Sequence, residues 1–148
     1  MTRAQGLTFL SLAVDSFGAV WLAGGAPGSA MRRLDGAGAM ETVPSPCRNY
    51  TTDPFIVQDL GNVATSPTGV VWFTEPRHAT IGRLDPETRA ISCYHAFGIS
   101  TSSGIPSYPN RLAPTSSGAV WFLETLYSPG RSLFPGGMRT FAIGRLVP

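Results

Sequence analysis

The 148-residue chain contains no lysine: all eleven of its basic residues are arginine, and they are scattered along the sequence. It therefore has neither the lysine of a phosphate-binding loop nor an amine that could form a Schiff base. The formal net charge is only +2 and no polybasic stretch occurs, which argues against a nucleic-acid partner. No uninterrupted apolar run approaches the ~18 residues of a membrane span, so we expect none.

Histidine and cysteine are also scarce, with two of each. Cys47 and Cys93 are too few for a zinc site made of cysteines alone, and they allow one disulfide at most. The two cysteines lie four positions out of phase in the repeat described below. We therefore expect isolated thiols, with a disulfide as the alternative.

The first residues lead straight into a strand-like segment, without the apolar region and small-residue cleavage site of a signal peptide. Either the chain is cytoplasmic or its sequence starts after a leader. The localisation is therefore left open.

The main positive feature is a repeat. A run of Gly, a small or branched residue, Val and Trp occurs three times, ending at Trp21, Trp72 and Trp121, which are 51 and 49 residues apart. Arg-Leu pairs follow at 33–34, 83–84 and 145–146. Repeats of this length are supersecondary units that bury their apolar faces only against their neighbours. We divide a single domain, 1–148, into units of about 7–58, 59–109 and 110–148.

Each unit has the pattern of four short strands. In the second unit these are 62–65, 70–74, 80–84 and 90–94, and the second of them is apolar on both faces, which predicts burial on both sides. The first unit fits strands at 7–14, 19–22, 30–34 and 40–43. The third fits 111–113, 119–123 and 141–146, and the sequence ends where a fourth strand would begin.

The segments between the strands have the composition of turns and loops. Asp15, Asp35 and Asp85 are expected to form tight turns, while 44–58, 96–109 and the insertion 125–138 are expected to be long connections. No long apolar period of 3.6 residues occurs, so we expect little helix. The predicted fold class is all-β: a partial β-propeller of about three four-stranded antiparallel blades, the third incomplete.

The second unit also carries a family motif. Its segment Val71–Glu75, followed by Ile81-Gly82-Arg83-Leu84 and Asp-Pro-Glu-Thr at 85–88, resembles the repeat of virginiamycin B lyase, the streptogramin lyase type of β-propeller. Residues 120–124 with 143–146 echo it, and 20–24 form a degraded copy. The resemblance implies a closed seven-bladed propeller that opens a cyclic depsipeptide antibiotic at its ester bond by Mg²⁺-assisted elimination. It is also compatible with an extracytoplasmic location.

The catalytic residues that the resemblance implies are only partly present. In that family the catalytic histidines lie in Pro-His-x-Ile-like segments that open a blade's innermost strand, whereas residues 108–112 here read Tyr-Pro-Asn-Arg-Leu. Asparagine cannot act as a general base. The remaining catalytic candidates are Glu75 and Glu124, which match the glutamate of the repeat, and His78.

Two interpretations of these candidates remain open. Carboxylates that converge at a propeller mouth would hold Mg²⁺ with water completing its shell. We favour the other interpretation, in which Glu75 and Glu124 are polar residues at strand ends and His78 and His95 are solvated loop residues. We therefore expect no metal site and no cofactor, with Mg²⁺ required only under the lyase alternative.

The repeated arginines and tryptophans are interpreted as structural. The arginines 33, 83 and 145 are expected to bond carbonyls or a carboxylate of a neighbouring blade rather than to form a ring for an anionic ligand. The three tryptophans are expected to be wedges in the core between blades.

Three units are fewer than the ~4–8 blades of a typical propeller, so the arc leaves an open apolar blade at each end. Because soluble proteins rarely expose apolar patches beyond a few hundred Å², we expect a protein partner or a second copy to cover these faces. The predicted function is that of a non-catalytic structural or protein-binding subunit of a larger assembly, and the alternative is a streptogramin lyase-type enzyme. The insertion at 125–138 supplies the predicted partner-binding residues: Leu126, Tyr127, Leu133, Phe134 and Met138.

Overall fold

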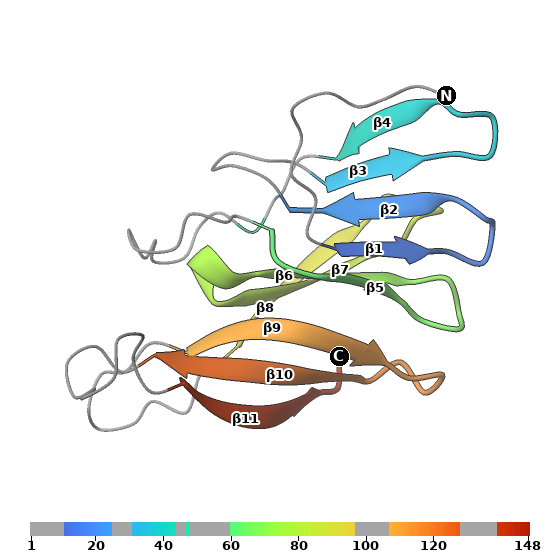
Figure 1. Ribbon diagram of the computed structural model, residues 1–148. Helices are drawn as coiled ribbons and strands as arrows, with labels where there is room; N and C mark the ends of the chain where they lie inside the picture. The colour runs from blue at the N-terminus through green and yellow to red at the C-terminus, as the bar shows by residue number, and fades with distance from the viewer. Residues whose placement is uncertain (1–10, 25–30, 44–46, 48–59, 97–106, 128–138) are drawn as a thin grey trace.

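The computed structural model describes residues 11–24, 31–43, 47, 60–96, 107–127 and 139–148, which form three antiparallel sheets (Figure 1). We call these sheets blades 1, 2 and 3. Blade 1 consists of β1 (Ser11–Val14), β2 (Val20–Ala23), β3 (Met31–Leu34) and β4 (Met40–Val43). Blade 2 consists of β5 (Val63–Thr65), β6 (Val71–Glu75), β7 (Thr80–Leu84) and β8 (Ile91–His95), and blade 3 of β9 (Ser107–Pro114), β10 (Val120–Tyr127) and β11 (Arg139–Leu146).

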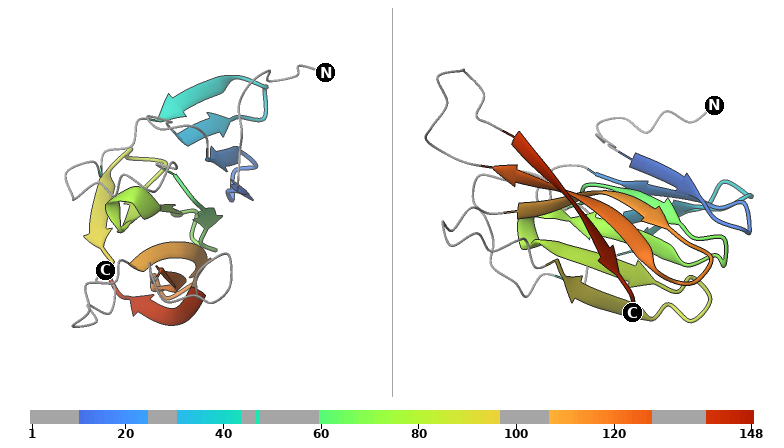
Figure 2. Two further views of the ribbon diagram at one scale, coloured as in Figure 1. Left: turned by 60° about the vertical axis from the view of Figure 1, so that its left-hand side comes forward. Right: turned by 90° about the horizontal axis from the view of Figure 1, so that it is seen from below.

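The order of the strands in each sheet follows the chain, so each blade is a meander, and blade 2 lies between the other two (Figure 2). The first strands, β1, β5 and β9, lie beside one another and line the inner edge of the arc. None of the three sheets closes on itself. The all-β fold class and the partial propeller with an incomplete third blade are therefore confirmed.

The tight turns are built as the sequence predicts. The last residue of the first turn in each unit is a glycine with positive φ, 81° at Gly18, 86° at Gly69 and 87° at Gly118. Only glycine adopts this conformation without strain, which explains why it precedes each repeat of the Val-Trp pair. At Asp15 and Asp35 the side chain accepts two backbone N–H groups of its own turn, which confirms both as turn formers.

A second recurring device brings an aromatic ring onto a glycine. Phe73 on β6 pairs with Gly82 on β7, and Phe122 on β10 pairs with Gly144 on β11. A Cβ added at either glycine would overlap the ring of its partner, so a side chain there would have to displace the phenylalanine. In blade 1 the equivalent pair is Leu22 and Arg32. There a leucine replaces the phenylalanine, and the residue opposite it is an arginine rather than a glycine. The glycine thus makes room for the phenylalanine ring over the neighbouring strand of the same blade.

Several details of the third unit differ from expectation. Strands β9, β10 and β11 are each eight residues long, so the expected connection 96–109 gives way to strand at Ser107 and the expected insertion begins only after Tyr127. A register shift between Leu123 and Glu124, opposite Pro109, forms a β-bulge. Because a bulge interrupts the ladder, a proline is tolerated there inside a strand.

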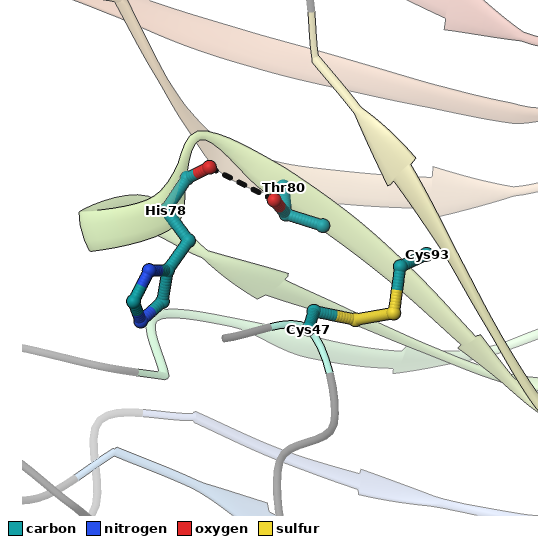
Figure 3. The surroundings of a disulfide bond; sticks show 4 residues. All are labelled: Cys47, His78, Thr80 and Cys93. Atoms are coloured by element: carbon teal, nitrogen blue, oxygen red, sulfur yellow. Dashed lines mark hydrogen bonds between the residues drawn. A yellow bond between two sulfur atoms is a disulfide. The ribbon is translucent and has the colours of Figure 1, made fainter. Parts of the chain in front are cut away.

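The expectation of isolated thiols is wrong, because Cys47 and Cys93 form a disulfide with Cα atoms 5.7 Å apart (Figure 3). Cys93 lies on β8 of blade 2, whereas Cys47 follows the last strand of blade 1. The bridge therefore links neighbouring blades rather than equivalent positions of one blade. This is why the phase difference in the repeat did not forbid it.

Candidate functional site

Both repeat glutamates are buried. Glu75 is the last residue of β6 and pairs with Thr80, while Glu124 lies inside β10 and pairs with Pro109. Glu75 ends its strand, as the interpretation of both glutamates as strand-end residues requires. Glu124 does not, because β10 continues to Tyr127. Taking a carboxylate out of water is costly unless it gains polar partners, and both glutamates make an interaction within the protein.

The two histidines lie at the end of blade 2 that also carries Glu75, and we call this end the rim. His78 ends a 3₁₀ helix, η1 (Pro76–His78), and His95 ends β8 opposite Thr80. The backbone carbonyl of His78 accepts a hydrogen bond of 2.8 Å from the Thr80 hydroxyl (Figure 3). His78 is buried and His95 half-buried, so the expectation of solvated loop histidines is wrong. The helix η1 contacts β9 of the next blade.

The β-bulge belongs to this rim as well. Asn110, which occupies the position where the lyase motif has its histidine, is the extra residue between Arg111 and Pro109, and it is exposed. Bulges often re-aim a side chain next to a functional site. The fold therefore brings η1, the end of β6 and the beginning of β9 together. Within the parts of the chain that the structure describes, no three His, Cys, Asp or Glu side chains are grouped closely enough to hold a metal ion.

Polar side chains also join blades 1 and 2 at their inner strands. The Ser11 hydroxyl accepts hydrogen bonds from the Asn62 side-chain amide at 2.9 Å and from the Val63 backbone N–H at 3.1 Å. The Asn62 backbone N–H donates to the Thr74 hydroxyl at 2.9 Å. These bonds satisfy buried backbone and side-chain groups, so they are explained by the packing of the blades.

The most informative side chains are the repeat tryptophans. We call the side of a blade that carries this tryptophan its forward face, and the opposite side its back face. Trp21 is 0% exposed and packs in a cluster with Val63 and Phe73 of blade 2, while Trp72 is 1% exposed and packs in a cluster with Val120 of blade 3. Trp121, at the same position of blade 3, is 45% exposed. The expectation that all three are core wedges is therefore wrong for Trp121 in this chain, because no described blade follows it.

The back face of blade 1, at the other end of the arc from Trp121, is exposed as well. Leu12, which corresponds to Val63 in the repeat, is 66% exposed, whereas Val63 is 3% exposed. Met40 pairs with Leu34 as Ile91 pairs with Leu84, and Met40 is exposed while Ile91 packs against the core between blades 1 and 2. Each end of the arc thus presents residues whose repeat equivalents are buried.

Two of the three repeated arginines lie over the tryptophan of their own blade. The guanidinium carbon of Arg33 lies 5.8 Å from the ring centre of Trp21, and that of Arg145 lies 5.6 Å from that of Trp121. Each arginine stands directly opposite its tryptophan on the neighbouring strand of the same blade. These contacts are cation–π interactions within a blade, which supports a structural role.

The predicted partner-binding residues are only partly covered. Leu126 and Tyr127 end β10, where they pair with Thr140 and Arg139, and their side chains lie outside the described part. Leu133, Phe134 and Met138 lie outside the described residues altogether. Their role in partner binding remains a prediction.

Comparison with solved structures identifies the fold. A catalytically inactive virginiamycin B lyase from Staphylococcus aureus, solved with quinupristin, matches 95% of the chain with a TM-score of 0.60 and 20% identity. A streptogramin B lyase matches 90% with a TM-score of 0.58 and 16% identity. This chain shares the virginiamycin B lyase propeller fold. The extracellular domain of a two-component system protein from B. thetaiotaomicron also matches, with a TM-score of 0.53 and 10% identity.

These matches cover less than half of each lyase, which limits the comparison to the fold. The match covers 42% of the first lyase and 39% of the second, so the chain spans about two fifths of their length. No protein-family model and no curated protein matches the sequence. At such identities the likeness establishes the propeller fold and leaves the activity open. The described residues also contain no helix with the length and apolarity needed to cross a membrane.

Proposed function

We propose that the chain is a non-catalytic propeller-like module that acts as a structural or protein-binding subunit of a larger assembly. The observation that carries this proposal is the contrast between Trp121, which is half-exposed, and Trp21 and Trp72, which are buried at the same repeat position. Burying the exposed half of a tryptophan, about 100 Å², would contribute ~2–3 kcal/mol to association. An anchor of this type is typical of binding hot spots.

The rim supports a structural role more strongly than a catalytic one. Asn110 stands where the lyase motif has its histidine, and the described residues hold no group of three metal-ligating side chains. Glu75 and Glu124 are buried on different blades. The low net charge, +2, gives no electrostatic basis for binding nucleic acid.

The test is a capture experiment with matched variants. The chain, immobilised at equal density as wild type, Trp121→Glu or Phe17→Glu, is exposed to its own soluble form and to an extract of its source organism. Phe17 is 65% exposed in the turn between β1 and β2, where its ring approaches Gly69 in the corresponding turn of blade 2, and it serves as the control. We expect a stoichiometric protein on wild type and on Phe17→Glu, and none on Trp121→Glu. Equal capture by all three, or by none, would reject the module.

The alternative function is a lyase of the streptogramin type. Two observations favour it: Glu75 and His78 lie at the rim of blade 2 that meets β9, and the fold is shared with a lyase solved with quinupristin. The intact assembly is incubated with quinupristin, with and without Mg²⁺, and ring opening is followed by mass spectrometry. Turnover that requires Mg²⁺ and is lost in Glu75→Gln would establish the lyase and overturn the non-catalytic proposal.

A further inference from the structure

The chain already builds one kind of interface twice. Between blades 1 and 2, the forward-face residues Trp21 and Met31 pack against Val63, Val71, Phe73 and Leu84 of the back face. Between blades 2 and 3, Trp72 and Ile81 pack against Leu112, Val120, Phe122 and Leu146 in the same way. Forward face against back face is therefore the association for which this sequence repeat is built.

Both halves of a third such interface are present and open. On the forward face of blade 3, Trp121 and Ile143 are exposed, although their equivalents in blade 2, Trp72 and Ile81, are buried. On the back face of blade 1, Thr42 stands at the position of Cys93, while the other five positions that form the apolar back face of blade 2 are again apolar. These residues are Leu12, Val20, Leu22, Leu34 and Met40, of which the first and the last are exposed and the others half-buried.

One charged residue lies on that back face. Arg32 occupies the position of Gly82, and its guanidinium donates a 3.1 Å hydrogen bond to the Thr42 hydroxyl on β4. The charge is thereby directed toward the outermost strand of the blade. The apolar positions nearer the inner edge remain available to a tryptophan.

From these observations we infer that the forward face of blade 3 binds the back face of blade 1 in a second copy of this chain. The inference rests on the proposed function and names the partner of the open faces. Because one copy offers a forward face at one end and a back face at the other, the contact is head-to-tail. Two copies supply six blades of the described kind, within the ~4–8 that closed propellers contain. A ring of this kind would be held together by two identical interfaces.

The experiment measures mass by light scattering on a sizing column over a wide concentration range. Wild type is expected at twice the 15.7 kDa chain mass. Trp121→Glu removes the forward-face anchor and Leu12→Glu removes its back-face receptor. Each should raise the dimer dissociation constant by about 30-fold or more, the effect of losing a hot-spot residue. Phe17→Glu changes a residue that is 65% exposed on a turn, and it should leave the dimer unchanged.

Mixing the two variants tests the geometry itself. The Trp121→Glu chain keeps an intact back face and the Leu12→Glu chain keeps an intact forward face, so one good interface can form between them. We expect the equimolar mixture to yield a dimer under conditions where each variant alone is monomeric. A variant that had failed to fold would not restore the dimer, so a misfolding artefact is excluded by the same result.

The contrary outcomes are distinct. A wild-type dimer that the mixture fails to restore would overturn the head-to-tail contact in favour of a symmetric one. A wild-type monomer at every concentration would overturn the second copy as partner. If that monomer is still captured by another protein through Trp121, the proposed function stands and only this inference falls; if nothing is captured, both fall.

Discussion

The pairing of Phe73 with Gly82 makes a quantitative prediction about the packing of blade 2. The strand position of Gly82 does not have positive φ, so alanine suits its backbone and reduces the entropy of the unfolded chain, a gain of ~0.4–1 kcal/mol. The added Cβ, however, would overlap the Phe73 ring, which is fully buried between blades. Overpacking of this type costs about 1–3 kcal/mol or more. We expect Gly82→Ala to lower the free energy of unfolding by about 2 kcal/mol.

Blade 1 supplies the compensating change. There Leu22 stands at the position of Phe73, and Arg32 at that of Gly82. Phe73→Leu alone should cost about 1–1.5 kcal/mol because it shortens a buried ring. In that background Gly82→Ala should be close to neutral. A double-mutant cycle should therefore show a coupling energy of about 2 kcal/mol in favour of the double variant.

The assay is urea unfolding followed by tryptophan fluorescence, with all variants at one protein concentration so that association does not differ between them. Gly144→Ala is the matched control, because its partner Phe122 is only half-buried whereas Phe73 is fully buried. We expect a smaller loss there. Additive effects of Gly82→Ala and Phe73→Leu, within ~0.5 kcal/mol, would refute the argument from ring overlap.

Three further predictions concern the turns and the link between blades 1 and 2. Reduction of the interblade disulfide, whose cysteines are 46 residues apart, should lower the stability by about 4 kcal/mol, measured as the change in the urea midpoint with and without reductant; an unchanged midpoint would contradict it. Asp15→Ala should cost about 3 kcal/mol and lower Tm by ~6–12 °C, because the buried carboxylate also accepts the Trp21 indole N–H at 2.8 Å. The matched Asp35→Ala, in an exposed turn, should cost about 1 kcal/mol, so equal losses would refute the role of the indole. At Asp85, hydrogen bonds from the backbone of its own turn, above all from residue 88, hold the pKa of the carboxyl below its ordinary 3.8. The turn therefore loses this support only as pH falls through the lowered pKa. A titration midpoint of Asp85 at or above 3.8, measured by NMR, would contradict this.

The sequence was sufficient to predict the blades and their turns. The repeat period placed Trp21, Trp72 and Trp121 at equivalent positions, and the glycine of each tight turn marked where the second strand begins. Blade 3 was less predictable, because Pro109 and the polar residues near it have loop composition. Their strand is formed by tertiary pairing with β10 across a bulge, which no local pattern indicates.

The candidate residues at the rim were predicted from the sequence, but their burial was not. Glu75, Glu124 and His78 were identified from the motif, but their burial arises only in the folded chain and no local pattern indicates it. The disulfide between Cys47 and Cys93 crosses two blades, so it could not be deduced from positions within one repeat. Exposure of the third tryptophan follows from the repeat only when each blade is assigned a forward and a back face, which requires the register.

The central claim, that the forward face of blade 3 is covered by protein in the working assembly, is tested most directly by hydroxyl-radical footprinting of the unmodified chain. Oxidation of the three tryptophans is measured by mass spectrometry in dilute solution, at high concentration and in an extract of the source organism. The account predicts that Trp121 reacts readily when dilute and becomes as protected as Trp72 in at least one of the other two conditions. Equal and high reactivity of Trp121 in all three would contradict it.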